Sequence, residues 1–496
     1  MRRSFRSLAA WCVPAALCGL AACTVGPDYR GAPPVAADAL KAPAFVRAPS
    51  AGVVATVPSA SAWWRSLGDP QLDSLIEAAL AHNPDVHAAQ ARLREARAQL
   101  LGQRAKELPK ASADVAAVRM RSPDLSKLSS GSNGDNGNHG GGRGPLQLYT
   151  AGLDASWEID LFGGTRRSIE AASAQADALD ADLADTQVSL AAEVAQAYVD
   201  LRDEQQRLVL AQQSADLQQR MLALTQARRA HGTAADVDVE RLSGQVETTR
   251  AALVPLDEQI AESLDRLAVL TGRAPGALDA DLSAARPLPT LPATVEVGDP
   301  ASLLRQRPDI RAAERRLASS NAQIGEHVAD YFPKVSLLGD LGFTAADPGH
   351  LFRKTNFSWL GVPYLQWNVL DFGRTAADVR SAKASRDEAS ARYEHAVLAA
   401  LQDANSALSR YGHQREHVVR LEQVDASAQR ALTLMRQRYA AGVATAIDLL
   451  DTERTQFSAQ QDVIAGRAEL LKDFVLLQKS LGLGWQAPGQ EQPQAS

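Results

Sequence analysis

The stretch PDVHAAQARLREARAQLLGQRAKELPK (Pro84–Lys110) returns later in the chain as PDIRAAERRLASSNAQIGEHVADYFPK (Pro308–Lys334). The two stretches align without a gap over 27 positions, and 11 of these positions are identical. Two more pairs follow in the same order: WEIDLFGGT (Trp157–Thr165) with WNVLDFGRT (Trp367–Thr375), and RAHGTAADVDVER (Arg229–Arg241) with YAAGVATAIDLLD (Tyr439–Asp451). Three matched pairs in one order indicate a tandem duplication, so we expect both halves to share one fold.

Each half begins with a helix and continues into strands. The helical stretches end at Pro109 and Pro333, because proline stops a helix and biases the residue before it towards extended geometry. The residues that follow alternate between apolar and polar side chains with period two, which predicts strands with one face of each kind. The expected strands lie near 111–119 and 147–159 in the first half, and near 334–344 and 357–369 in the second.

The expected strands have the length that a tilted membrane strand needs. Four aromatic residues lie near strand ends, as interfacial aromatic residues of membrane barrels do: Trp157, Trp359, Trp367 and Phe372. A soluble sandwich is the alternative that this pattern leaves open.

A long proline-free stretch follows the second strand of each half, and it predicts a helix over about 166–230 and another over about 374–440. Each helix would be roughly 100 Å long if continuous. Each ends at a glycine, Gly232 or Gly442, where we expect the chain to turn back into another helix. Such helices cannot be buried singly in a globule, so we expect them to pack side by side as coiled coils.

The N-terminus has the pattern of a bacterial lipoprotein precursor. Three arginines and a short apolar run precede Leu20-Ala21-Ala22-Cys23, which resembles a lipobox cleaved before the cysteine. We therefore expect residues 1–22 to be removed and Cys23 to carry a diacylglycerol and an amide-linked acyl chain, with no other cofactor. Cys12 and Cys18 lie in the removed segment, so the mature chain would have no disulfide bond.

Four membrane strands cannot close a barrel, because about eight is the smallest useful number. Open strand edges are not tolerated in hydrocarbon, so the barrel must be shared between protomers. The long helices would continue it as a helical tube. A lipid-anchored barrel joined to such a tube is a duct. The net charge of -6 is spread along the chain and gives no indication of nucleic-acid binding.

The chain resembles the outer membrane factors of the TolC and OprM kind, and in particular their NodT-like lipoprotein branch. The resemblance covers nearly the whole chain; it is clearest in CTVGPDYR (Cys23–Arg30), WWRSLGDPQLDSLIEAALAHNPDV from Trp63, YFPKVSLLGDLG from Tyr331, VPYLQWNVLDFGR from Val362 and the closing LGLGW (Leu481–Trp485). It implies a mainly α-helical protein with a membrane β part, in which four strands from each of three protomers form a twelve-stranded barrel above a periplasmic α-barrel.

The resemblance also implies a function. A homotrimer in the outer membrane of a Gram-negative cell would pass small molecules such as drugs outward from an inner membrane pump of the resistance-nodulation-division type, joined to it by a periplasmic membrane-fusion adaptor. Thr24, following the cysteine, favours the outer membrane among lipoproteins. The alternatives are a duct for type I protein secretion and a coiled-coil scaffold lipoprotein without a pore.

These observations divide the chain into five parts. We expect a signal peptide (1–22) and a lipid-anchored extension (23–68). The first repeat is expected over 69–290, the second over 291–485, and a disordered tail over 486–496.

The expected working site is a gate at the periplasmic helix turns. Asp448 and Asp451 lie three residues apart and so share a helix face; in a trimer they would form a ring of six carboxylates that favours cations. Asp448 would also complete a capping box with Thr445, and both roles can hold together. By resemblance, Ile447 matches an apolar constriction in OprM-like ducts; otherwise it is a core residue of the coiled coil.

Tyr439 and Asp238 match gate residues that tie neighbouring hairpins in TolC-like proteins. The chain departs from TolC at Ala444, where an arginine is expected, so Arg436 or Arg438 would have to replace the missing cation. The departure favours an OprM-like apolar closure.

An enzyme is the competing class, because HQREH (His413–His417) fits the zinc-protease pattern H-x-x-E-H. The motif lies in the middle of an expected coiled coil, and the Gly/Pro/Gln tail after Trp485 is a poor source of a third ligand. We therefore expect neither catalysis nor a metal site.

Overall fold

The computed structural model describes residues 24–49, 51–58, 62–120 and 146–485. The expected signal peptide, Cys23 and the tail lie outside this range. The chain forms two compact units. The sheet unit comprises Met1–Ala32, Glu95–Ala176 and Arg316–Ala389, and the hairpin unit comprises Pro33–Arg94, Asp177–Arg315 and Ser390–Ser496.

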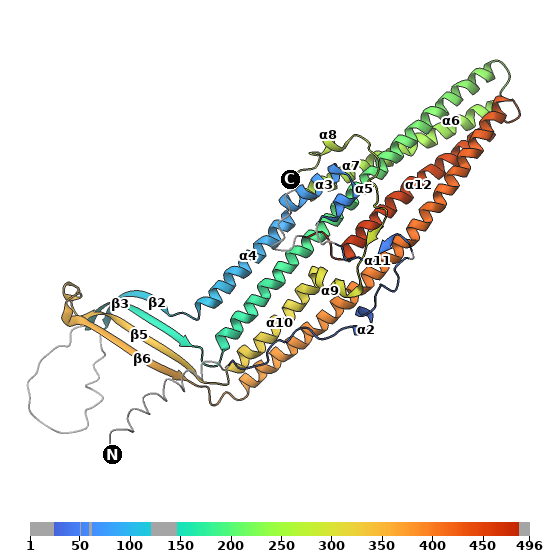
Figure 1. The fold of residues 1–496 in the computed structure, drawn as a ribbon. Coiled ribbons are helices and arrows are strands. Elements are labelled where there is room, and N and C mark those ends of the chain that lie inside the picture. Colours follow the sequence, from blue (N-terminus) through green and yellow to red (C-terminus); the bar gives the residue numbers. More distant parts are fainter. Residues whose placement is uncertain (1–23, 50, 59–61, 121–145, 486–496) are drawn as a thin grey trace, which may run out of the picture. The chain divides into compact units, whose positions relative to one another are not determined.

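A four-stranded antiparallel sheet lies in the sheet unit, with strand order β2-β3-β5-β6 (Figure 1). Its strands are β2 (Lys110–Met120), β3 (Leu146–Ile159), β5 (Lys334–Ala345) and β6 (Phe357–Gln366). They confirm the four predicted strands, except that β6 ends before the expected 367–369. Val369 donates its N–H to the carbonyl of Trp367 at 3.1 Å, so the chain turns there and cannot continue the ladder.

The period-two pattern places unlike side chains on the two faces of the sheet. Asp154 lies opposite Asp340 on one face, and Leu153 lies opposite Leu341 on the other. Every residue of β2 and β6 is exposed, including Trp359, of which 76% is accessible. Within the described chain, β2 and β6 each pair along one side only, so the sheet has two open edges.

Two pairs of helices reflect the duplication. The helices α4 (Pro84–Ala105) and α10 (Pro308–Ala329) have 22 residues each and precede the sheet strands of each half. The helices α5 (Gly164–Ala230) and α11 (Arg374–Ala440) follow the second strands and have 67 residues each. Both long helices are continuous (Figure 1), which confirms the prediction from the proline-free stretches.

In the hairpin unit each long helix turns back into a partner. After α5 come α6 (Asp236–Ala251) and α7 (Leu253–Leu270), whereas the single helix α12 (Ala446–Ser480) follows α11. Pro255 has no N–H to donate to residue 251, which explains why the first partner is divided near Ala252. Among the described residues, no helix combines the length and the apolar character that crossing a membrane requires.

Shorter elements complete the fold, and β1 and β4 form a two-stranded parallel pair. They are α2 (Ala37–Leu40), β1 (Val53–Val54), η1 (Trp63–Leu67), α3 (Pro70–His82), α8 (Asp279–Leu282), β4 (Val295–Glu296), η3 (Pro300–Ser302), α9 (Leu303–Gln306), η4 (Pro348–His350) and η5 (Lys354–Asn356).

Candidate functional site

The two helix turns of the hairpin unit have the same backbone geometry. Gly232 and Gly442 both have φ of 73°, in the left-handed region that glycine adopts without strain. In the first turn, Gly232 donates its N–H to the carbonyl of Arg229 at 2.8 Å, and Thr233 donates to Arg228 at 2.9 Å. The second turn repeats both bonds, from Gly442 to Tyr439 and from Val443 to Arg438, each at 3.0 Å. These paired bonds are Schellman motifs that satisfy the last carbonyls of α5 and α11.

The ends of the two hairpins are joined by Arg228 and Tyr439. Arg228 Nη1 donates a hydrogen bond to the Tyr439 hydroxyl at 2.7 Å, and the guanidinium carbon lies 5.2 Å from the ring centroid. The expectation named Tyr439 but missed Arg228. The sequence contained only a general indication of it, since cations are favoured in the last turn of a helix.

Below the turns, an apolar cluster packs the same hairpins together. Leu222 of α5 and Val239, Leu242 and Val246 of α6 are buried, and Leu450 of α12 packs against them. The start of α12, where the candidate gate residues lie, therefore packs against the first hairpin.

Asp448 forms a capping box at the start of α12. Its Oδ2 accepts the Thr445 N–H at 2.9 Å, and Thr445 Oγ1 accepts the Asp448 N–H at 3.2 Å. The hydrogen bonds from Thr445 lower the pKa of Asp448, so its carboxylate stays ionised at neutral pH.

The other candidate residues differ in their surroundings. Asp451 is exposed, one helical turn after Asp448. Ile447 and Asp238 are half-buried, at the starts of α12 and α6. The structure brings Tyr439 to Arg228, and no hydrogen bond joins Tyr439 to Asp238 among the described residues.

A second cation near the helix turns, Arg436, is paired within its own hairpin. Arg436 Nη2 donates to Glu453 Oε1 at 3.2 Å, and the Glu453 side chain is only 10% exposed. Burial raises the pKa of Glu453, against the opposing effect of Arg436. Arg436 therefore ties α11 to α12 within one hairpin, whereas Arg228 makes a polar contact between the two hairpins.

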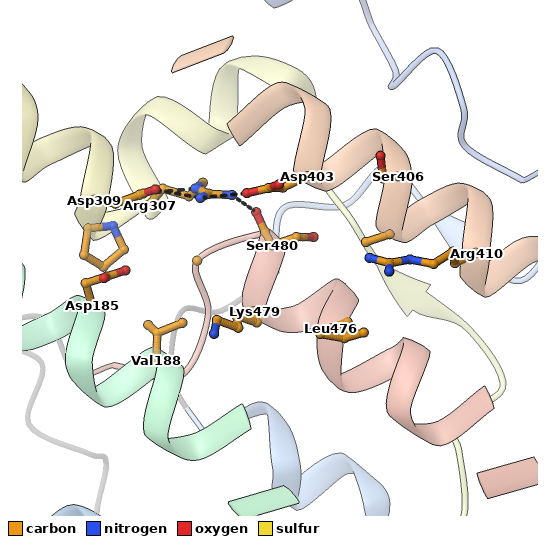
Figure 2. A pocket seen from close by; sticks show the side chains of 13 residues that line it. Asp185, Val188, Arg307, Asp309, Asp403, Ser406, Arg410, Leu476, Lys479 and Ser480 are labelled. Atoms are coloured by element: carbon orange, nitrogen blue, oxygen red, sulfur yellow. Dashed lines mark hydrogen bonds and ion pairs between the residues drawn. The ribbon is translucent and has the colours of Figure 1, made fainter. Parts of the chain in front are cut away.

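Elsewhere in the hairpin unit, a cavity of about 240 Å³ lies between α5, α11 and the end of α12 (Figure 2). Arg307 lies on it and donates to Asp309 at 2.6 Å, to Asp403 at 3.4 Å and to the Ser480 carbonyl at 2.9 Å. These partners occupy the guanidinium, so Arg307 serves as a structural cross-link. Burial raises the pKa of Asp185 on the opposite wall.

The protease-like motif His413–His417 lies inside α11. Over the ranges that the structure covers, no group of three or more His, Cys, Asp or Glu side chains is arranged to hold a metal ion.

The sequence of both halves matches one known family. The sequence model described as outer membrane efflux protein matches residues 75–273 and 300–483, which together make up most of the chain. The chain belongs to the outer membrane efflux protein family. The two matched segments correspond to the two halves of the duplication.

Relatives of this efflux protein have matching length. The antibiotic efflux pump outer membrane protein ArpC of Pseudomonas putida is 31% identical over 484 residues, covering 96% of either chain. Nodulation protein T of Rhizobium leguminosarum bv. trifolii is 31% identical over 474 residues, covering 94% of this chain and 95% of that protein.

Solved structures share the fold of this efflux protein. The outer-membrane channel OprN matches with a TM-score of 0.80 and 36% identity, over 94% of this chain and 100% of that one. The open state of the Neisseria gonorrhoeae MtrE outer membrane channel matches with a TM-score of 0.80 and 28% identity, over 93% and 98%. The expected family, the helical and antiparallel-strand fold and the outer membrane location are thereby confirmed.

Proposed function

We propose that this protein is the outer membrane duct of a tripartite efflux system and not an enzyme. It would receive small molecules, drugs among them, from an inner membrane resistance-nodulation-division pump through a periplasmic adaptor. The named activities of ArpC and of the toluene efflux protein TtgC of Pseudomonas putida, also 31% identical, support this assignment. The structural observation that carries it is the sheet with two open edges, which is incomplete without further copies of the chain.

The proposed assembly is a homotrimer in which β6 of one copy pairs with β2 of the next, giving twelve strands. The register of this pairing can be predicted from the internal duplication, because equivalent residues of the two repeats make equivalent contacts. Trp157 donates Nε1–H to the Glu107 carbonyl at 2.9 Å, and its counterpart Trp367 donates to Tyr331, the counterpart of Glu107, at 3.0 Å. The two repeats therefore make the same tryptophan-to-carbonyl hydrogen bond at equivalent positions.

The remaining pairing inside the chain, β3 with β5, joins the end of one repeat to the start of the next. By the same equivalence, β6 should pair with β2 of a neighbouring copy. The observed pair Ser156 and Leu338 then predicts that Gln366 lies opposite Asp114 of the neighbour, and the pair Ala155 and Gly339 predicts Leu365 opposite Val115. Polar residues thus meet polar ones and apolar residues meet apolar ones, as a shared barrel needs.

Cross-linking tests the assembly. A variant with Leu365→Cys and Val115→Cys, extracted from outer membranes in mild detergent, should form disulfide-linked dimers and trimers upon oxidation. The matched control, Leu365→Cys with Ala117→Cys, displaces the register by two residues and should cross-link weakly. A monomer of uniform mass that cross-links in neither variant would remove the basis for the duct, since four strands leave open edges in lipid.

Conductance tests the function itself. The purified trimer should conduct ions across a planar bilayer, because a continuous barrel and tube enclose water. A stable trimer without conductance would favour the scaffold alternative.

Two further features belong to the proposal. Cys23 would carry the diacylglycerol and the amide-linked acyl chain, and the intact mass of the purified protein would reveal both. At the periplasmic end, the carboxylates of Asp448 and Asp451 would surround the pathway and favour cations. The apolar side chain of Ile447 would narrow it, while Tyr439 and Asp238 would lie where the hairpins of neighbouring copies meet.

A further inference from the structure

The first described residues of the chain, 24–32, form a segment that we call the N-terminal strap. Val25 donates its N–H to the carbonyl of Phe162 at 3.1 Å. Thr24 packs against Gly163, where a Cβ atom would lie only 2.9 Å from the Thr24 Cα. The strap therefore begins on the short connection between the end of β3 and the start of α5.

Arg167, in the first turn of α5, holds the strap through several hydrogen bonds. Its Nε donates to the Val25 carbonyl at 3.1 Å and its Nη2 to the Gly26 carbonyl at 3.4 Å. Nη2 also pairs with Asp28 Oδ1 at 2.6 Å. The hydrogen bond from Arg167 and its charge lower the pKa of Asp28.

The burial of Arg167 shows how far its guanidinium depends on the strap. Only 4% of its side chain is exposed. A buried guanidinium is tolerated when its N–H groups have acceptors. Beyond the strap, Arg167 Nη1 donates to Glu170 Oε2 at 2.8 Å. Without the strap, Nε and Nη2 would lose the acceptors described above.

Helix α10 also contacts the strap, through Asn321 and Gly325. Asn321 is 8% exposed and donates Nδ2–H to the Pro27 carbonyl at 2.9 Å. A side chain at Gly26 would overlap the backbone of Gly325, and a Cβ atom at Gly325 would lie 2.8 Å from the Arg167 side chain. Two glycines thus allow strap, helix and arginine to approach closely.

We propose that Arg167 is the positioning residue of a clamp that fixes the N-terminal strap at the end of the sheet, and with it the point where the acyl chains on Cys23 enter the membrane. The acyl chains rest on the function proposed above, whereas the clamp does not. Thr24 is one peptide bond from Cys23, so holding the strap in place restricts how far the anchor can move. A flexible strap of nine residues would let its end move by roughly 15 Å.

Hydrogen exchange of the full-length protein in mild detergent, read by mass spectrometry, tests the clamp. In the Arg167→Gln variant, the Val25 amide, whose N–H is bonded to the Phe162 carbonyl, should exchange about tenfold faster than in the unmodified protein, the change expected when the charged hydrogen bonds that hold the strap are lost. Peptides from β3, β5 and α10 should keep their protection. Arg167→Lys retains the charge and should restore part of the protection.

Arg166→Gln is the matched control. Arg166 is the preceding residue, and its backbone N–H and its Nε both donate to Asp160. Equal exchange of 24–32 in the two glutamine variants would overturn the proposal. So would loss of protection throughout the sheet unit, which would make Arg167 a general folding residue. The intact mass reports acylation separately: a protein without acyl chains but with a protected strap would refute the lipid proposal and leave the clamp standing.

Discussion

Arg228 at the end of α5 meets Tyr439 at the end of α11 through both a hydrogen bond of 2.7 Å and a cation–π contact of 5.2 Å. Tyr439→Phe removes the hydrogen bond alone, and Arg228→Ala removes both interactions. We expect both variants to increase single-channel conductance in planar bilayers, with the larger increase for Arg228→Ala. The free energy of unfolding should change by less than about 1 kcal/mol, because the pair is accessible to solvent.

Arg229→Ala is the control for this experiment. Arg229 pairs with Asp236 inside the first hairpin, so its loss leaves the contact between hairpins intact. Equal conductance of the two alanine variants would mean that the Arg228–Tyr439 contact does not restrain the gate.

Asp451→Asn should lower the preference of the duct for cations. The exposed carboxylate contributes to the negative field of the proposed ring, and its amide does not. The reversal potential in a KCl gradient measures the change. Asp448→Asn should act in the same direction and cost at most about 1 kcal/mol of stability through the weakened capping box. Asp462→Asn, an exposed change of the same kind further along α12, is the control; a selectivity that follows Asp462 instead would refute the ring.

Phe162 and Phe372 occupy equivalent positions in the two repeats, yet their surroundings differ. Phe162 stacks on Phe332 with centroids 4.7 Å apart, whereas Phe372 is 96% exposed with a φ of 54°. The counterpart of Phe332 is Leu108, itself 67% exposed. In the proposed trimer, Phe372 would pack on Leu108 of the next copy.

Phe162→Ala should therefore lower the stability of the protomer by about 3 kcal/mol, whereas Phe372→Ala should weaken the trimer. Thermal unfolding reports the first effect, and the temperature at which the trimer dissociates in detergent reports the second. Identical behaviour of the two variants would contradict the inferred contact.

Glu204 on α5 should make the stability of the hairpin unit depend on pH. Burial raises its pKa to about 7, although Ser263 of α7 donates a hydrogen bond to it at 2.8 Å. The folded state thus binds the proton more tightly than the unfolded state. The resulting contribution to the free energy of unfolding is fully present below about pH 4.5 and is lost as pH rises through 7. The neighbouring charges are Asp200, Asp203 and Arg207.

Melting temperatures between pH 5 and 8 measure this dependence. After a discount for partial exposure, about 1 kcal/mol, or roughly 1–2 °C for a chain of this size, is expected. Glu204→Gln should flatten the curve and keep the Ser263 bond. Part of the slope should persist, because burial also raises the pKa of Asp473 to about 6. An unchanged slope in the glutamine variant would rule out Glu204 as its origin.

Features that depend on local sequence were predictable. The absence of proline marked both long helices, alternation marked four strands, and Gly232 and Gly442 stand where the structure has its left-handed turns. The early end of β6 escaped prediction, because the apolar residues 367–369 continue the pattern although the backbone turns.

Contacts between segments far apart in the chain could not be predicted from the sequence. Arg228 is one of two basic residues in the last turn of α5, and only the packing of two hairpins selects it as the partner of Tyr439. Likewise, no sequence pattern indicates that Gly26 lies against Gly325. The role of Arg167 depends on its contact with a strap more than a hundred residues upstream.

The equal length of α5 and α11 limits how this chain can evolve. Both helices have 67 residues, and their ends meet at Arg228 and Tyr439. Removing one turn from a single helix would retract its end by about 5.4 Å and separate that pair. Insertions and deletions that survive in descendants should therefore occur in matched pairs, one in each repeat, so that the two copies of an ancient duplication still change length together.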